Sequence, residues 1–143
     1  MTTNEIIDEL NRLKINGSED YAQLDRLDEL MAVLAQNPDG YLACAAMLNV
    51  LEQHPQVEFG VPGQLVHTIE SYRGYYENLL LASLDRQPTA TTIWLLNRII
   101  NAAVDPGKSQ LVARLHRLRT HPHADAQAQA EAEEFYRFQK REA

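Results

Sequence analysis

Few residues of this sequence have the types and spacing that catalysis or metal binding requires. His67 and Glu70 are three residues apart in the segment VEFGVPGQLVHTIESY (57–72). On a helix this spacing puts an imidazole and a carboxylate on one face, where they could share a metal ion or a proton. A helical two-metal site needs a second such pair and further carboxylates from facing helices, and the sequence contains no second pair. A buried His67, hydrogen-bonded across a helix interface, is therefore the favoured interpretation.

A denser group of potential ligands consists of His121, His123 and Asp125, at the predicted start of the last helix. Two imidazoles and a carboxylate could bind a metal ion. Asp125 or its neighbours would equally complement the positive end of the helix dipole. Both interpretations stay open here, and we expect neither a metal ion nor a cofactor.

Nucleophilic and phosphate-binding motifs are missing from the sequence. Cys44 lies in the apolar run LACAAML, where a free thiol packs as a small hydrophobic side chain. No serine occupies a Gly-x-Ser-x-Gly turn, and the six glycines form neither a GxxxxGK nor a GxGxxG loop. We therefore expect that the protein is not an enzyme.

The segment YRGYYE (72–77) is more informative, because tyrosine and arginine are the residue types that anchor protein interfaces. One amphipathic helix cannot turn all of these side chains toward the core. The alternative is that two tyrosines are in the core and the third has no role at the surface. We predict that a protein partner contacts Glu58, Glu70, Tyr72, Tyr75, Tyr76 and Glu77.

The net charge of −7 is unevenly distributed. Residues 1–71 hold twelve acidic and three basic side chains, whereas residues 72–143 carry a small positive excess. An acidic first half repels nucleic acid and anionic lipid and attracts a basic partner, although it is also consistent with a surface that only keeps the protein dissolved. The predicted long-range attraction comes from Asp20, Asp25, Asp28 and Glu29. A basic cluster in the second half, Lys108, Arg114, Arg117 and Arg119, is interpreted as a solvated face or as partners of internal ion pairs.

Apolar residues recur at helical spacing in almost every segment, which predicts an all-α protein. Thr2 and Glu5 have the spacing of a capping box at the first helix. About eight helices are expected, over residues 3–14, 18–35, 39–53, 64–72, 74–86, 89–104, 109–120 and 124–140. The segment 39–53 is so apolar that we interpret it as the central helix.

Four predicted helix ends share a pattern of leucine, three mostly polar residues and proline: LAQNP (34–38), LEQHP (51–55), LDRQP (84–88) and LRTHP (118–122). The last three prolines are 33 and 34 residues apart, which is the length of a helix pair. The pattern predicts a short stack of antiparallel helix pairs, a HEAT-like α-solenoid, with an irregular helical bundle as the alternative. We expect one helical domain over residues 1–143. No segment has the features of a signal peptide or a membrane span, so we expect a cytoplasmic protein.

Residues 51–101, with VEFGVPGQLVHTIE, the tyrosines of 72–76 and LLLASLDRQPTATTIWLLNRIIN, resemble small bacterial immunity proteins. Such proteins are the partners of polymorphic or contact-dependent toxins and are encoded beside them. The resemblance implies a non-enzymatic antidote that binds one cognate toxin domain in the cytoplasm. It implies no particular binding residue, because these families vary most at the surface that contacts the toxin.

Together these observations predict an immunity protein that neutralises a cognate toxin domain through an acidic surface that carries tyrosines. A basic nuclease is the expected class of toxin. We expect it to act as a monomer or weak dimer and to bind neither nucleic acid nor membranes. The alternative is a helical-repeat scaffold or adaptor that binds a peptide or protein partner along a concave surface.

Overall fold

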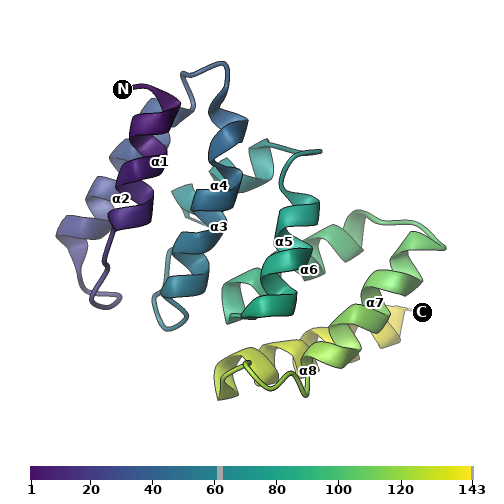
Figure 1. Cartoon of the computed structure of the whole chain (residues 1–143). Coiled ribbons are helices and arrows are strands. Elements are labelled where there is room, and N and C mark those ends of the chain that lie inside the picture. Colours follow the sequence, from purple (N-terminus) through teal and green to yellow (C-terminus); the bar gives the residue numbers. More distant parts are fainter. Residues whose placement is uncertain (61–62, 143) are drawn as a thin grey trace. The chain divides into compact units, whose positions relative to one another are not determined.

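A computed structural model describes residues 1–60 and 63–142 of the chain. Within these residues the protein has eight α-helices, one short 3₁₀ helix and no strand, which confirms the all-α prediction (Figure 1). The helices are α1 (Thr3–Arg12), α2 (Tyr21–Leu34), η1 (Gly40–Ala43), α3 (Cys44–Gln53), α4 (Gln64–Ser71), α5 (Glu77–Arg86), α6 (Ala90–Ala102), α7 (Gly107–Leu118) and α8 (Ala126–Glu142). None of them combines the length and the apolar character that crossing a bilayer requires.

Local side-chain caps explain why several helices begin where the sequence predicts. Thr2 caps α1: its hydroxyl accepts the N–H of Glu5 at 3.1 Å, and the Glu5 carboxylate accepts the N–H of Thr2 at 3.0 Å. Thr89 forms the equivalent reciprocal pair with Thr92 at the start of α6, at 3.1 and 2.9 Å. Each pair satisfies backbone N–H groups that the first turn of a helix leaves without an internal acceptor.

Three predicted α-helix starts are displaced by three residues or more, and the helices predicted from residues 109 and 124 begin at Gly107 and Ala126. Ser18, the predicted cap of the second helix, instead accepts the backbone N–H of Glu58 at 2.9 Å, and α2 begins at Tyr21. The segment predicted as one helix from residue 39 begins as η1 and becomes an α-helix at Cys44. The segment predicted as a helix from residue 74 begins at Glu77. Val61 and Pro62, in the predicted break before α4, lie outside the described residues.

The recurring prolines have the predicted position. Pro38, Pro55, Pro88 and Pro122 follow the ends of α2, α3, α5 and α7 by two to four residues. Proline cannot continue a helix, because it has no N–H and its ring clashes with the preceding turn. These positions therefore separate the helices as the sequence pattern indicates.

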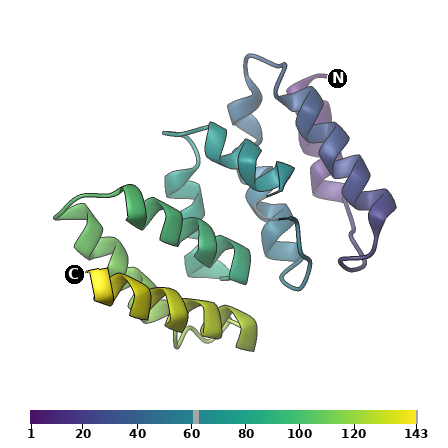
Figure 2. The same ribbon diagram turned by 180° about the vertical axis from the view of Figure 1, so that it is seen from behind.

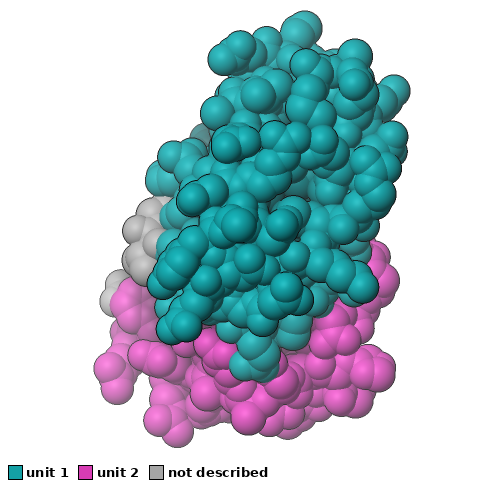
Figure 3. Space-filling model, turned by 90° about the vertical axis from the view of Figure 1, so that its left-hand side faces the viewer, with its two compact units in different colours: residues 1–79 teal, residues 80–143 magenta. Residues whose placement is uncertain are grey.

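The chain divides into two compact units, residues 1–79 and 80–143, which Figure 3 colours separately. In the first unit, α1 packs against α2 and α3, and α4 packs against α2 and α3 (Figures 1 and 2). The first helices of the two pairs, α1 and α3, thus pack on each other, and so do the second helices, α2 and α4, as predicted for a stack of helix pairs. Its core is aliphatic and includes Ile6, Leu10, Leu27, Leu30, Met31, Leu34, Met47, Leu48, Leu51, Leu65 and Ile69.

The second unit contains a bundle in which α6, α7 and α8 each contact the other two (Figure 2). The inward face of α8 carries small side chains at four-residue spacing, Ala128 and Ala132, both fully buried. Small residues on this face let the neighbouring helices approach α8 closely. The prediction of one domain over the whole chain stays a prediction.

Candidate protein-binding surface

A tight turn between α4 and α5 determines how the predicted tyrosines are presented. The N–H of Tyr75 donates to the carbonyl of Tyr72 at 3.0 Å, and Gly74 adopts φ = +93°, a conformation that favours glycine. The two carboxylate oxygens of Glu77 accept the N–H of Gly74 at 2.8 and 3.1 Å. The turn therefore joins three of the six predicted contact residues, Tyr72, Tyr75 and Glu77, in one hydrogen-bonded structure.

Tyr75 stacks on Tyr41 of η1, with the ring centroids 4.4 Å apart and the ring planes at 27°. We call these two residues the tyrosine pair. Both rings are open to solvent, at 36% exposure for Tyr41 and 55% for Tyr75. Leu42 of η1 and Leu79 in the first turn of α5 are also exposed. An exposed aromatic pair with apolar neighbours is typical of a protein-interaction surface.

Tyr72 has a structural position beneath the surface, since it is half-buried and its hydroxyl lies against Gly40. A β-carbon on residue 40 would overlap that hydroxyl, so the close approach requires glycine. Burial raises the pKa of the Tyr72 phenol, and the neighbouring Cys44 raises it further. The contact between Tyr72 and Gly40 holds η1 against the end of α4, and thereby supports Tyr41.

Tyr76 corrects the predicted surface. Its side chain is only 6% exposed, so it belongs to the core and is not available to a partner. Tyr76 precedes the buried Leu80 by four residues and Leu84 by eight, which is the spacing of one helical face. This spacing was the signal in the sequence that Tyr76 is a core residue.

The three predicted acidic contacts have different surroundings. Glu58 is exposed in the segment after α3, where its backbone is bound to Ser18. Glu70 is half-buried on α4. Glu77 is also half-buried, and its carboxylate is occupied by the turn at Gly74. Of the three, Glu58 is the most accessible to a partner.

Sequence reasoning missed Tyr41 and Leu42, because it treated residues 39–53 as a central helix with several buried faces. The buried residues of this segment lie mainly from Ala43 onward, whereas Tyr41 and Leu42 are exposed. Asp39 and Gly40, directly after Pro38, were the signal of an irregular start. Such a start leaves the first side chains of the segment outside the core.

The acidic character predicted for the first half belongs to the first unit. Residues 1–79 hold 13 acidic and four basic side chains, a formal charge of −9. Asp25, Asp28 and Glu29 are exposed on α2, as predicted, and burial together with the charge of Asp25 raises the pKa of Asp28. Glu29 pairs with Arg26 at 3.1 Å. Asp20 is half-buried and accepts the N–H of Asn16 at 2.9 Å.

His121 uses both ring nitrogens within the second unit. Its Nε2 lies 2.9 Å from the carbonyl oxygen of Asp85, which can only accept, and its Nδ1 accepts the N–H of His123 at 3.0 Å. Asp125 accepts the N–H of Ala128 at 2.8 Å and so caps α8. These contacts give His121 and Asp125 structural roles. The described residues include no group of three or more potential metal ligands.

His67 is exposed, so the expectation of a buried, interface-spanning histidine is wrong. The reason is the direction of α4, which turns Leu65, Val66 and Ile69 into the core and His67 away from it.

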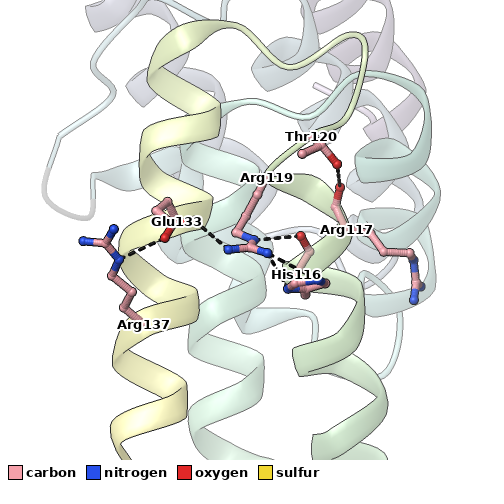
Figure 4. Close-up of polar contacts among 6 residues, drawn as sticks. All are labelled: His116, Arg117, Arg119, Thr120, Glu133 and Arg137. Atoms are coloured by element: carbon pink, nitrogen blue, oxygen red, sulfur yellow. Dashed lines mark hydrogen bonds and ion pairs between the residues drawn. The ribbon is translucent and has the colours of Figure 1, made fainter.

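Two residues of the basic cluster in the second unit form ion pairs within the fold. This is one of the two interpretations that the sequence allowed. Arg114 pairs with Asp85 at 2.7 Å, and Arg119 pairs with Glu133 at 2.8 Å. Glu133 also pairs with Arg137 at 2.9 Å (Figure 4). The hydrogen bond from Arg119 is the main cause of the lowered pKa of the Glu133 carboxyl, and Arg137 lowers it further. Two of the predicted basic residues are thus engaged within the fold.

The candidate site is therefore a surface of the acidic first unit. It consists of the exposed tyrosine pair and the nearby contact of Tyr72 with Gly40. Compared with known proteins, the chain matches no family model, no curated protein and no solved structure.

Proposed function

We propose that this protein is a cytoplasmic immunity protein that binds and neutralises a cognate toxin domain. The observation that carries the proposal is the tyrosine pair, two stacked and solvent-exposed rings in the acidic first unit. The resemblance of residues 51–101 to bacterial immunity proteins agrees with this function.

Residue type and exposure both support a role in protein binding. A tyrosine ring brings a large apolar area to an interface and loses little side-chain entropy, while its hydroxyl keeps a polar contact. Tyr41 and Tyr75 already restrict each other by stacking, so a partner would order fewer side-chain conformations on binding. We therefore place the tyrosine pair at the centre of the contact, with Leu42, Leu79 and Glu58 as further contacts.

Charge indicates the class of partner. A unit with a formal charge of −9 attracts a basic protein surface and repels nucleic acid. A toxin domain that cleaves nucleic acid needs a basic substrate cleft, and an acidic protein that covers such a cleft would exclude the substrate. We propose a basic nuclease domain as the partner, bound by a monomer or weak dimer of this chain.

The test is co-expression with the protein encoded by the neighbouring gene. The wild-type chain should restore growth of cells that express the toxin domain and should co-purify with it. The Tyr41→Ala/Tyr75→Ala variant should do neither, while Tyr21→Ala, which removes a separate exposed tyrosine of the same unit, should do both. Failure of the wild-type chain to bind that neighbour would contradict the proposed function.

The stacked helix pairs of the first unit favour a second candidate, a helical-repeat adaptor. An adaptor needs no toxin beside it and protects no cell. Co-purification without protection from toxicity would therefore select the adaptor function.

A further inference from the structure

The second unit contains a groove of about 500 Å³ that the proposed function does not use. Its walls come from α7 with the residues just before it and from the C-terminal half of α8. The volume is within the range of about 300–1,000 Å³ that is typical of small-molecule sites. The groove is therefore large enough to hold a compact ligand.

Two lysines give the groove a positive charge. Lys108 comes from the first turn of α7 and Lys140 from the last turn of α8. Asp105, also in the wall, accepts the N–H and the hydroxyl of Ser109, and these hydrogen bonds, with the charge of Lys108, lower its pKa. Asp105 offsets one lysine, whereas Lys140 has no ion pair within the part of the chain described. The excess of one positive charge matches a ligand with one negative charge.

Gln139 also lines the groove, and its amide is held by hydrogen bonds. Its side chain is 3% exposed, and its Nε2 donates to the Oδ1 atoms of Asn97 at 2.7 Å and Asn101 at 2.8 Å. Because an amide nitrogen has two hydrogens, both are used by these two bonds. A ligand can therefore form a hydrogen bond with Gln139 only through its Oε1 atom, which is an acceptor.

Tyr136 forms an apolar wall of the groove. Its ring centroid lies 4.6 Å from the guanidinium carbon of Arg119 and 4.7 Å from the ring centroid of His116. Arg119 is itself fixed by Glu133 and by the carbonyl oxygen of His116 (Figure 4). Val112 continues the wall from α7. A flat or branched apolar group would pack against this surface.

We propose that this groove binds an N-acyl amino acid carboxylate, either as a free molecule or as the C-terminal residue of a peptide. The carboxylate binds Lys140 and Lys108, the amide N–H donates to Gln139 Oε1, and the apolar side chain packs on Tyr136 and Val112. An N-acyl amino acid thus carries all three groups that the groove calls for: a negative charge, a hydrogen-bond donor and an apolar side chain.

The test is an NMR titration of the ¹⁵N-labelled full chain with N-acetyl-phenylalanine. Amide signals of α7 and α8 should shift, and N-acetyl-phenylalaninamide, which lacks the negative charge, should bind about tenfold more weakly. 3-Phenylpropionate, which has the carboxylate and ring but no N–H, should also bind more weakly. Equal binding of the acid and its amide would overturn the proposal.

Two matched variants locate the binding. Lys140→Gln removes the exposed groove lysine and should weaken N-acetyl-phenylalanine binding about tenfold. Arg141→Gln removes the next, exposed charge, which does not line the groove, and should leave the affinity unchanged. Equal effects of the two substitutions would also overturn the proposal, since they would indicate attraction by overall charge.

A pentapeptide that ends in phenylalanine distinguishes the two sources of the ligand. Binding as tight as that of N-acetyl-phenylalanine, and lost on C-terminal amidation, assigns the groove to peptide C-termini. Binding of N-acetyl-phenylalanine without binding of the pentapeptide assigns it to the free molecule.

Discussion

The ring of Tyr41 lies on the ring of Tyr75, at a centroid distance of 4.4 Å, and joins η1 to the turn that precedes α5. Neither ring is buried, so the contact contributes less to the core than to the shape of the surface. The residues next to Tyr41 in η1 and near Tyr75 in the turn are also in contact, since the hydroxyl of Tyr72 lies against Gly40. A packed support and an exposed aromatic pair are thus parts of one structure.

Gly40→Ala should destabilise the fold by about 1–3 kcal/mol, because the new methyl group overlaps the Tyr72 hydroxyl. Urea denaturation measures the change. Tyr72→Phe removes that hydroxyl, so Gly40→Ala should cost less in a Tyr72→Phe background. An equal cost in both backgrounds would show that the hydroxyl does not set the requirement for glycine.

Much of the fold is encoded locally and was therefore predictable. The Thr2 and Glu5 capping box, the repeated prolines and the apolar periodicity all act within a few residues of the chain, and the structure has helices close to the predicted ranges. One of the helix starts that moved depends on a distant partner. Ser18 is the example, because its hydroxyl binds the backbone of Glu58 in another segment.

The candidate surface was predicted only in part, for the same reason. Tyr75 was identified by its residue type, but its partner Tyr41 comes from η1, and no local pattern connects the two segments. Tyr76 was assigned to the surface although its spacing to Leu80 indicates the buried face. The two tyrosines are consecutive in the sequence, and only their different positions relative to the core separate their roles.

Cys44 should be unreactive in the folded protein. Burial raises the pKa of its thiol to about 11, with a further contribution from the negative charge of Glu77. At pH 8 the thiolate fraction is then about one in a thousand, and the thiolate is the reactive form. Ellman's reagent should label the unfolded chain rapidly and the native chain only at the rate of unfolding. Rapid labelling of the native chain would contradict the buried position of Cys44.

Glu133 should make stability depend on pH in the acidic range. Arg119 and Arg137 lower its pKa below the ordinary value of 4.5, so its contribution is present above that value and is lost as the pH falls through the lowered pKa. Glu133→Gln should therefore lower the melting temperature at pH 7, and the difference from wild type should disappear at acidic pH. Glu134→Gln, an exposed neighbour on α8, is the matched control and should show a smaller difference at pH 7.

Asp25→Lys/Asp28→Lys should slow association with the basic partner without changing its dissociation rate. Both side chains are exposed on α2, and neither is among the proposed contacts, so they act through the long-range field. Stopped-flow kinetics at low salt should show an association rate lower by a factor of several, and the difference should vanish at high salt. An unchanged rate at low salt would show that the acidic unit does not steer the encounter.

The most direct test of the central claim is the affinity of the partner domain for the Tyr41→Ala/Tyr75→Ala variant, measured by calorimetry beside Tyr21→Ala. We predict binding weaker by about a thousandfold for the double variant, since central interface tyrosines each contribute about 2 kcal/mol and every 1.4 kcal/mol is tenfold in affinity. Binding of Tyr21→Ala should be unchanged. Wild-type affinity of the folded double variant would contradict the assignment of the tyrosine pair as the binding centre.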